Sequence, residues 1–293
     1  MAALCLAVDI GGTKLAVGLV DAHGELADAA QVPTPSTDDP EAVFAALAGL
    51  IDRVTAAAEP GSLRACGVGC GGPMEPGGAT VSPLNIAAWR RFPLRSRVHE
   101  HVDLPVAVDN DAKALALGEW WVGAAVGSDN FLAMVVSTGV GGGIVLDGRL
   151  LDGRLGNAGH IGHVVVEPDG RPCSCGGFGC LEAEASGTAI AAITGGVPTD
   201  APKEVVERVG TMVGRAVASV ANLLDLDLAL VAGSVALGLG EPFFAAARAE
   251  LGRRARMDFS RSVRIQPAGL GVHGPLVGAG ALGWRLCGAG PGR

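Results

Sequence analysis

The fold is decided by the stretch LCLAVDIGGTKLAVGLV at residues 4–20. Two apolar, partly β-branched runs, 4–10 and 15–20, flank the turn Gly11-Gly12-Thr13-Lys14. Short apolar runs bounded by glycine and polar residues are typical of β-strands. The stretch therefore predicts two strands joined by a glycine turn.

The same pattern occurs again at residues 131–146. The runs FLAMVV (131–136) and GIVL (143–146) flank a turn that contains Thr138 and Gly139. One hairpin in each half indicates a duplicated α/β unit whose turns present backbone N–H groups, for which phosphate is a natural ligand. Two such turns could also arise by chance in a chain with 46 glycines. The threonines beside them, Thr13 and Thr138, favour phosphate binding.

The composition is that of a folded protein with a large core. Of the 293 residues, 49% are hydrophobic and 18% are charged, and at about 150 residues per domain the length suggests two domains. A net charge of −8 without a basic run argues against nucleic-acid binding. The first apolar run stops at Asp9, short of the roughly 20 residues that span a membrane. With seven cysteines and no signal-peptide pattern, we expect a cytoplasmic protein that binds no membrane.

Strand and helix signals alternate through the rest of the chain. The sequence Asp38-Asp39-Pro40-Glu41 supplies a cap, an early proline and a first-turn acid for a helix at 41–58. Further strands are expected at 64–70, 105–109 and 226–232, and further helices at 112–121, 203–225 and 275–287.

Two polar residues, Asn110 and Asp111, follow the expected strand at 105–109. In open α/β sheets, ligands collect at the carboxyl ends of the strands, so this position suits a catalytic carboxylate. An Asn-Asp pair is also a common turn former, and the residues alone leave both interpretations open.

Four potential metal ligands lie close together in the sequence: His163, Cys173, Cys175 and Cys180. Three thiolates and one imidazole make a closed tetrahedral set for zinc, with no open position for an activated water. We therefore predict a structural zinc loop. Free buried thiols, or one disulfide with a spare thiol, are the alternative. The other cysteines (Cys5, Cys66, Cys70 and Cys287) are expected to be small buried hydrophobic residues.

Six segments, taken together and in order, resemble one family. They are Asp9-Ile-Gly-Gly-Thr-Lys14, Asn110-Asp111, Ser137-Thr-Gly-Val-Gly-Gly-Gly143, Gly159-His-Ile-Gly-His163, Cys173-Ser-Cys-Gly-Gly-Phe-Gly-Cys180-Leu-Glu182 and Ala232-Gly-Ser-Val-Ala236. The chain resembles the ROK (repressor, open reading frame, kinase) sugar kinases. The resemblance implies the two-domain α/β actin/hexokinase/Hsp70-type ATPase fold with an interdomain cleft. The expected domains are an N-terminal domain at 1–110, joined by a returning helix at about 275–293, and a larger domain at 111–274 that carries the zinc loop.

The resemblance also implies ATP-dependent phosphorylation of the 6-hydroxyl of a hexose or an N-acetylhexosamine, with ATP and Mg²⁺ as cofactors. Asp111 looks like the catalytic base, Asn110 would bind sugar hydroxyls, and Asp9 would orient Mg²⁺ through water. The expected nucleotide-binding residues are Gly11, Gly12, Thr13, Thr138 and Gly139 at the phosphates and Gly233 and Ser234 near the adenosine. Lys14 is either a phosphate contact or a solvated strand residue.

The family's sugar-contacting positions correspond here to His160, His163, Glu182, Gly72 and Asn85. Many glucokinases of the family have Glu where this chain has His160, and some bacterial N-acetylmannosamine kinases look similar to this chain at that position. A carboxylate accepts from two neighbouring hydroxyls, whereas a neutral imidazole offers one donor and one acceptor and could face an acetamido group. N-acetylmannosamine is therefore the first expected substrate, and glucose is the alternative.

Two expectations concern other classes of protein. The family's repressors carry an added DNA-binding domain before the sugar-binding core, and with a first strand at about Leu4 we expect no such role here. A sugar sensor without activity is disfavoured by the presence of Asp111. The family resemblance suggests a homodimer or homotetramer, and the sequence leaves open whether polyphosphate can replace ATP.

Overall fold

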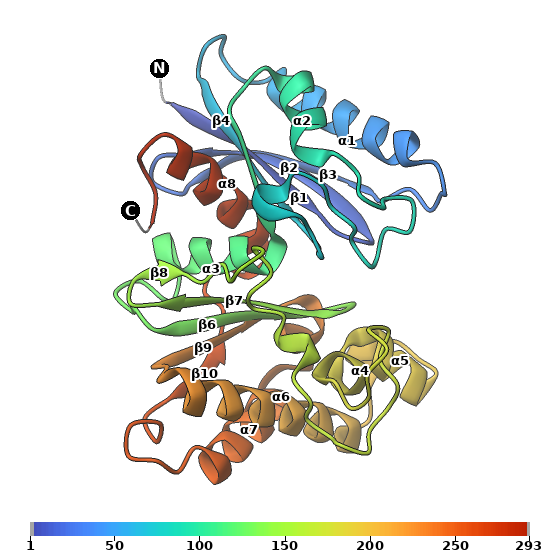
Figure 1. The fold of residues 1–293 in the computed structure, drawn as a ribbon, viewed down its shortest axis with the longest axis vertical. Coiled ribbons are helices and arrows are strands. Elements are labelled where there is room, and N and C mark those ends of the chain that lie inside the picture. The colour runs from blue at the N-terminus through green and yellow to red at the C-terminus, as the bar shows by residue number, and fades with distance from the viewer. Residues whose placement is uncertain (1–2, 292–293) are drawn as a thin grey trace. The chain divides into compact units, whose positions relative to one another are not determined.

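The computed structural model describes residues 3–291, and their contacts divide them into two compact units (Figure 1). Unit 1 contains the chain up to Val126, the segment Asp152–Ala158 and the chain from Val272 onward. Unit 2 contains Gly127–Leu151 and Gly159–Gly271. Within the described residues, no helix combines the length and the apolar character needed to cross a membrane.

Unit 1 is built on a five-stranded sheet with the order β3-β2-β1-β4-β5. The strands β1, β2 and β3 are antiparallel neighbours, whereas β4 runs parallel to β1 and β5 parallel to β4. The strand bounds are Leu4–Ile10 (β1), Lys14–Asp21 (β2), Leu26–Pro33 (β3), Leu63–Cys70 (β4) and Val106–Asn110 (β5). The helix bounds are Pro40–Thr55 (α1), Leu94–Val102 (α2), Asp111–Val122 (α3) and Gly274–Leu286 (α8), with a 3₁₀ turn at Pro76–Gly78.

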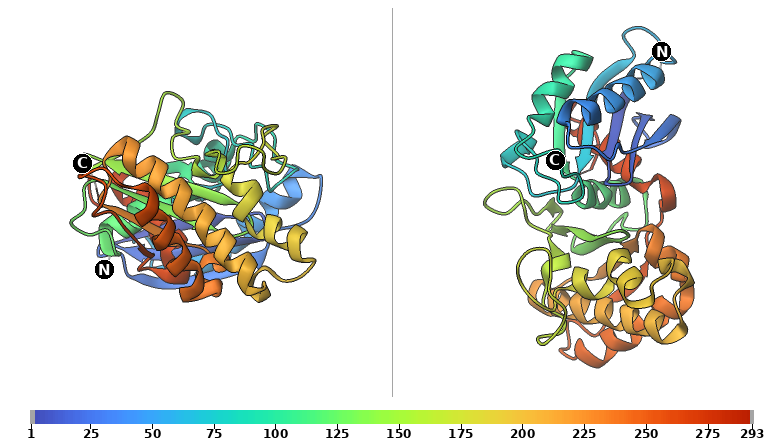
Figure 2. Two further views of the ribbon diagram at one scale, coloured as in Figure 1. Left: turned by 90° about the horizontal axis from the view of Figure 1, so that it is seen from below. Right: turned by 90° about the vertical axis from the view of Figure 1, so that its right-hand side faces the viewer.

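The alternation of side chains along β1 explains how helices cover both faces of this sheet. Leu6, Val8 and Ile10 belong to one core with the buried residues of α1. Ala7 points the other way and packs with Leu276 of α8. Figures 1 and 2 show the resulting layers, with α1 and α8 on opposite sides of the strands. The α8 backbone approaches so closely that a Cβ added at Gly67 of β4 would lie 1.8 Å from a carbonyl oxygen of α8.

Unit 2 repeats the same topology with the strand order β10-β9-β6-β7-β8. Its β6 pairs antiparallel with β7 and parallel with β9, as β1 does with β2 and β4. The strand bounds are Phe131–Val136 (β6), Val140–Leu146 (β7), Arg149–Leu150 (β8), Leu228–Ala232 (β9) and Arg264–Pro267 (β10). The helix bounds are Leu181–Ala185 (α4), Gly187–Thr194 (α5), Lys203–Leu224 (α6) and Ser234–Arg254 (α7), with 3₁₀ turns at Ile161–His163 and Pro198–Asp200. The shared strand order confirms the duplicated α/β unit that the two hairpins predict.

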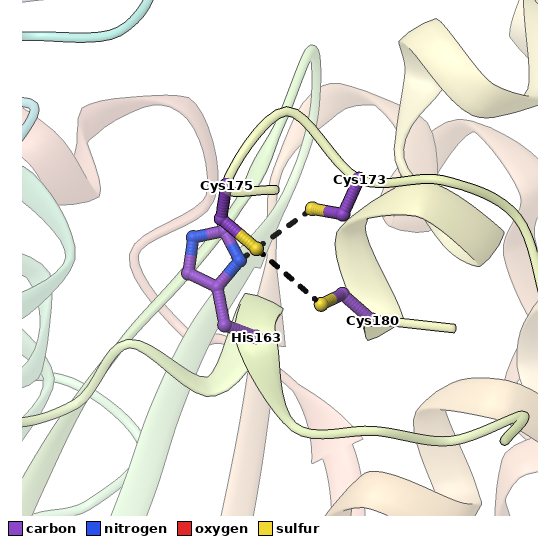
Figure 3. Close-up of side chains that lie close together, drawn as sticks. All are labelled: His163, Cys173, Cys175 and Cys180. Carbon is purple, nitrogen blue, oxygen red and sulfur yellow. Dashed lines mark hydrogen bonds between the residues drawn. The ribbon is translucent and has the colours of Figure 1, made fainter. Parts of the chain in front are cut away.

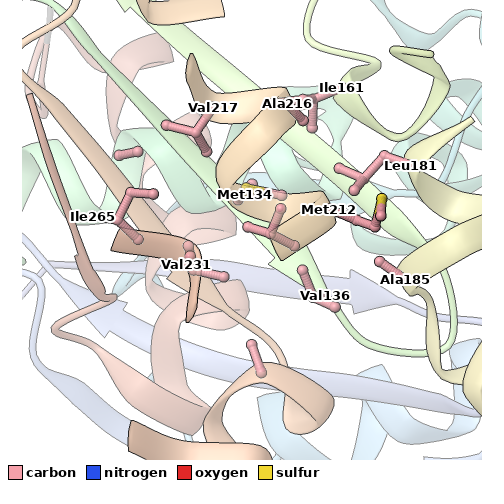
Figure 4. Close-up of a cluster of buried hydrophobic side chains, with 14 of the residues drawn as sticks. Met134, Val136, Ile161, Leu181, Ala185, Met212, Ala216, Val217, Val231 and Ile265 are labelled. Atoms are coloured by element: carbon pink, nitrogen blue, oxygen red, sulfur yellow. The ribbon is translucent and has the colours of Figure 1, made fainter. Parts of the chain in front are cut away.

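The core of unit 2 lies between its sheet and the helix α6. Met134, Val136 and Val231 on the strands meet Met212 and Val217 of α6 in one buried cluster (Figure 4). This core also takes up Leu181 and Ala185 of α4, and so fixes the short helix that carries Glu182.

The division into units differs from the expected boundary at residue 110, because α3 packs against α8. A Cβ added at Gly278 of α8 would lie 2.2 Å from the carbonyl oxygen of Ala114, which shows how closely the two helices approach. The chain therefore stays in unit 1 up to Val126 and returns to it for Asp152–Ala158.

Candidate active site

The first glycine turn of unit 1 is held in shape by its own backbone and by the start of the next loop. The N–H of Gly11 donates to the carbonyl of Lys14 over 3.0 Å, and the hydroxyl of Thr34 donates to the carbonyl of Gly11 over 2.7 Å. A Cβ added at Gly12 would lie 2.5 Å from the Cβ of Asn85. The structure thus brings the predicted phosphate turn and the predicted sugar-loop residue Asn85 into contact, and only glycine fits between them.

Asn110 and Asp111 lie where a strand gives way to a helix. Asn110 is the N-cap of α3, and its Oδ1 accepts a 3.0 Å hydrogen bond from the N–H of Ala112. Asp111 is the first residue of α3, and its Oδ1 lies 2.8 Å from the same N–H. The pair therefore forms a helix cap. This agrees with the turn-forming role that the sequence left open for an Asn-Asp pair. The cap uses Oδ1 of Asn110 and leaves its amide group able to donate to a hydroxyl.

The parallel strands bring Asp9 and Asp111 to the same edge of the sheet. Asp9 stands opposite Gly69 in the neighbouring strand, and a Cβ added at Gly69 would lie 3.4 Å from the Cα of Asp111. Asp9 is buried, and this burial, reinforced by the charge of Asp111, raises its pKa to about 7, although Lys14 opposes the rise. Two carboxylates that resist joint ionisation form a site that favours a cation.

The chemistry of this carboxylate pair fits Mg²⁺. Carboxylate oxygens are ligands that Mg²⁺ accepts, and it is usually held by one or two of them together with waters and substrate phosphates. Burial and the two carboxylates raise the pKa of the nearby Cys70 thiol well above its usual value, and Mg²⁺ takes oxygen rather than sulfur ligands. Asp9 could therefore hold a hydrated Mg²⁺ through water beside the Gly11–Thr13 turn, while the charge of Asp111 adds to the negative potential of the site.

Unit 2 brings its own predicted nucleotide residues together. The carbonyl of Thr138 accepts a 2.9 Å hydrogen bond from the hydroxyl of Thr188, which ties the second glycine turn to α5. The hydroxyl of Ser137 in that turn lies 3.1 Å from the hydroxyl of Ser234. Gly233 has a φ of +101°, and a Cβ there would lie 2.2 Å from the carbonyl oxygen of Val136. The turns at Thr138-Gly139 and Gly233-Ser234 are thus neighbours.

The predicted sugar residues of unit 2 surround the 3₁₀ turn Ile161–His163. His160 precedes this turn and is exposed, and its ring lies 6.1 Å from that of His163, centroid to centroid. Glu182 is tied to the second hairpin, because its Oε2 accepts a 2.9 Å hydrogen bond from the N–H of Val140. This contact connects the helix α4 with the hairpin that carries Thr138.

The four predicted metal ligands converge on one point (Figure 3). Their ligand atoms all lie within 4.8 Å of one another. The Sγ of Cys173 lies 3.7 Å from Nδ1 of His163, and the Sγ atoms of Cys175 and Cys180 are also 3.7 Å apart. Ligands at about 2.3 Å from a tetrahedral metal are separated by about 3.8 Å. The cluster can therefore hold a four-coordinate metal ion with little rearrangement.

A buried carboxylate that the sequence did not reveal supports this loop. The side chain of Glu184 is 0% exposed, and its Oε1 accepts a 2.6 Å hydrogen bond from the N–H of Arg171. Burial alone would raise its pKa, but that N–H and the Arg208 guanidinium lower the pKa below its usual value. The contacts fix the loop before Cys173 to α6. Two residues after Glu182, Glu184 has no spacing signal that could have identified it.

Each unit therefore contains part of the predicted site. Unit 1 contains Asp9, Gly11, Gly12, Thr13, Lys14, Gly72, Asn85, Asn110 and Asp111. Unit 2 contains Thr138, Gly139, His160, His163, Cys173, Cys175, Cys180, Glu182, Gly233 and Ser234. Gly72 lies near Asn85 in the same loop, since the carbonyl of Gly72 accepts a 3.3 Å hydrogen bond from the N–H of Leu84.

Three of the four cysteines outside the metal cluster are buried as expected, namely Cys5, Cys66 and Cys70. Cys287 was also expected to be buried but is exposed, because it follows the last residue of α8.

Comparison with known protein families identifies the chain. The family model described as ROK family matches residues 5–285. The chain belongs to the ROK family. This ROK chain is 37% identical over 250 residues to an N-acetylmannosamine kinase of Escherichia fergusonii, covering 80% of this chain and 84% of the relative. It is 38% identical over 242 residues to a glucokinase of Halalkalibacterium halodurans, covering 80% of this chain and 73% of the relative.

Solved structures agree with this family membership. The ROK chain matches the crystal structure of a ROK family glucokinase from Streptomyces griseus in complex with glucose and AMPPNP, with a TM-score of 0.85 and 31% identity. The match covers 96% of this chain and 99% of that one. The two repeated α/β units are those of the actin/hexokinase type of ATPase fold, which confirms the expected fold class.

Proposed function

We propose that this ROK family sugar kinase transfers the γ-phosphoryl group of ATP to the 6-hydroxyl of N-acetylmannosamine. One observation carries the catalytic part of the proposal. Asp111 begins α3 at the sheet edge that also holds the buried Asp9, and Asp9 lies one residue before the end of the strand that leads into the Gly11–Thr13 turn. A base, a cation site and a phosphate turn thus lie within one unit.

Asp111 acts as the base in this proposal. Its carboxylate takes the proton of the 6-hydroxyl while that oxygen attacks the γ-phosphorus, and the bond from the γ-phosphorus to the β-γ bridging oxygen breaks as ADP leaves. Phosphoryl transfer asks little covalent chemistry of the protein, so positioning and charge neutralisation supply most of the catalysis. Asp9 would orient a nucleotide-bound Mg²⁺ through water, and the cation would supply charge neutralisation at the phosphates.

The nucleotide residues hold and align ATP. The N–H groups of the Gly11–Thr13 turn and of the Thr138-Gly139 turn face phosphates, and Gly233-Ser234 lies near the adenosine. The pairing of Ser137 with Ser234 supports this assignment, because it keeps the second phosphate turn and the adenosine turn together.

His160 supports the choice of an N-acetylated sugar. Its exposed imidazole offers one donor and one acceptor, and so can pair with an acetamido group where a carboxylate could only accept. The relative from Escherichia fergusonii is named an N-acetylmannosamine kinase. Glucose is the second candidate, since the relatives from Halalkalibacterium halodurans and Streptomyces griseus are named glucokinases.

Product analysis tests the reaction itself. The enzyme is incubated with Mg-ATP and N-acetylmannosamine, and the products are examined by phosphorus NMR. We expect one ADP for each sugar phosphate formed, with the phosphorus coupled to the two protons on carbon 6. Formation of ADP without a sugar phosphate, or phosphate at another hydroxyl, contradicts the proposal.

We also propose that zinc occupies the cluster of His163, Cys173, Cys175 and Cys180. Three sulfurs and one imidazole nitrogen suit zinc, and four protein ligands leave it a structural role. His163 would link the metal to the neighbouring His160. Thiolate ligands of this kind persist in a reducing compartment, so we place the enzyme in the cytoplasm. Metal analysis of the purified protein should find about one zinc per chain, lost together with activity on chelation, and purified active protein without zinc would contradict the assignment.

A further inference from the structure

Lys113 is a buried cation that the proposed function does not use. It lies in the first turn of α3, two residues after Asp111, and its side chain is only 1% exposed. A buried ammonium group is costly unless it is paired and hydrogen-bonded. Its partners therefore show what the position is built to hold.

Those partners join three parts of unit 1. Nζ of Lys113 lies 2.9 Å from Oδ2 of Asp109 at the end of β5 and 2.7 Å from Oδ1 of Asp152. It also donates to the carbonyl of Gly156 over 3.4 Å. Asp152 and Gly156 both belong to the segment Asp152–Ala158, so one ammonium group connects this segment to β5 and α3.

The segment Asp152–Ala158 is a closed loop that is docked through polar contacts. The N–H of Ala158 donates to the carbonyl of Asp152 over 3.0 Å and closes the loop. The side-chain amide of Asn157 pairs with both backbone groups of Met74, over 3.2 Å to its N–H and 3.0 Å to its carbonyl. Leu155, the one large apolar residue of the segment, is exposed. Little apolar burial supports the loop, so its position depends on these polar anchors.

The loop leads directly into the sugar-recognition motif. Only Gly159 separates Ala158 from His160, so their Cα atoms can be no more than about 7 Å apart. The loop is anchored at Asp152, Gly156 and Asn157. These anchors therefore limit the positions that the backbone of His160 can occupy. A loosened loop would give His160 more positions to sample, which weakens binding of the sugar group that it contacts.

We propose that Lys113 and Asp152 form a positioning clamp for sugar recognition, resting on the proposed function of His160. The clamp holds the loop that precedes His160 against the helix that begins with Asp111. Neither residue touches the reacting atoms in this proposal. Breaking the clamp therefore affects binding of the sugar and leaves binding of ATP unchanged.

The variant Asp152→Ala tests the clamp with little risk to folding, because the Asp152 side chain is 69% exposed. We expect the KM for the sugar to rise about tenfold, with kcat within about threefold and the KM for ATP unchanged. Asp152→Asn keeps an oxygen acceptor for Lys113 and should fall between wild type and Asp152→Ala. Hydrogen exchange of the amides at 153–159 should become faster in Asp152→Ala.

A matched control comes from another ion pair of the same length. In α7, Oε1 of Glu241 lies 2.7 Å from Nη1 of Arg248, and the Glu241 side chain is 72% exposed. Glu241→Ala removes a comparable exposed carboxylate without touching the loop, and should leave the KM for the sugar and the exchange at 153–159 as in wild type.

A double-mutant cycle tests whether Asp152 acts through Lys113. In a Lys113→Met background, Asp152→Ala should raise the KM for the sugar by less than twofold further. If Lys113→Met does not fold, the cycle is replaced by the comparison of Asp152→Ala with Asp152→Asn.

Two results would overturn the clamp. One is a sugar KM in Asp152→Ala within twofold of wild type. The other is an equal loss in both KM values together with a lower melting temperature, which would indicate a purely structural pair. Failure of the proposed function looks different, because wild type itself would phosphorylate neither N-acetylmannosamine nor glucose. In that case the affinities of wild type and Asp152→Ala for the same two sugars, measured by calorimetry, decide whether the clamp exists.

Discussion

Replacing Asp111 by asparagine should slow the enzyme and stabilise the ligand-free protein at the same time. Asparagine keeps an Oδ1 acceptor for the N–H of Ala112, so the helix start survives. Loss of the general base should lower kcat by about 10²- to 10⁴-fold, with sugar binding within about tenfold of wild type. The stabilisation follows from Asp9, whose pKa the charge of Asp111 helps to raise.

The size of the stabilisation can be worked from the pKa of Asp9. Burial first, and Asp111 second, raise this pKa from 3.8 to about 7. The free energy of unfolding therefore falls by about 4 kcal/mol as the pH rises from 3.8 to about 7. The loss is complete above pH 7 and absent below pH 3.8. Since burial is the larger cause, we assign about 1–2 kcal/mol to Asp111. Asp111→Asn should therefore gain this amount at pH 8, where Asp9 is charged, and little at pH 5, where Asp9 is protonated.

Urea denaturation at pH 5 and pH 8 without magnesium measures this gain, and a coupled ADP assay measures turnover. Asp28→Asn is the control, because it removes the same charge from the exposed edge strand β3. A variant that keeps wild-type turnover would remove Asp111 from its catalytic role. A stability difference that is the same at both pH values, or equal to that of the control, would refute the coupling between Asp9 and Asp111.

Three further predictions concern single residues. Burial alone would raise the pKa of Glu250, but three arginines lower this pKa to about 2. Glu250→Gln should therefore lower the free energy of unfolding, measured by urea denaturation at pH 7, by on the order of 3 kcal/mol. A stability difference between variant and wild type that does not shrink as the pH falls from 4.5 toward 2 would contradict this prediction. Gly233→Ala forces a Cβ to 2.2 Å from the Val136 carbonyl and should raise the KM for ATP by about tenfold or more, whereas an unchanged KM would remove this turn from nucleotide binding. His160→Glu should shift the ratio of kcat/KM toward glucose by about tenfold or more, and an unchanged sugar ranking would count against the acetamido assignment.

The parts of the fold that depend on local pattern could be predicted from the sequence. The strands β1 and β6 begin and end where the apolar runs do, and Asp39 caps α1 through a 2.9 Å bond to the N–H of Glu41. These features depend on neighbouring residues, so a short stretch of sequence contains the whole signal. The cluster of four candidate metal ligands could be predicted for the same reason, since all four lie within about twenty residues of one another.

Features that depend on residues far apart in the chain were not predicted. Helix α7 was missed, because Gly240, with a φ of +64°, and Pro242 interrupt its pattern. The contact of Lys113 with Asp152 joins residues 39 positions apart, and Lys113 alone looks like an ordinary exposed helix residue. The boundary between the units moved to Val126 because α3 packs against a helix from the far end of the chain. For the Lys113 contact and for the unit boundary, the deciding partner lies far away in the sequence, whereas α7 was missed because of residues within the helix itself.

We propose N-acetylmannosamine as the preferred substrate of this ATP-dependent sugar kinase. The most direct measurement is ADP release with Mg-ATP over N-acetylmannosamine, N-acetylglucosamine, glucose and mannose, compared as kcat/KM. We expect the highest kcat/KM for N-acetylmannosamine, at least about tenfold above that for glucose. A glucose value equal or higher would contradict the role given to His160 in sugar choice, and no sugar-dependent ADP release with any of the four would contradict the kinase assignment itself.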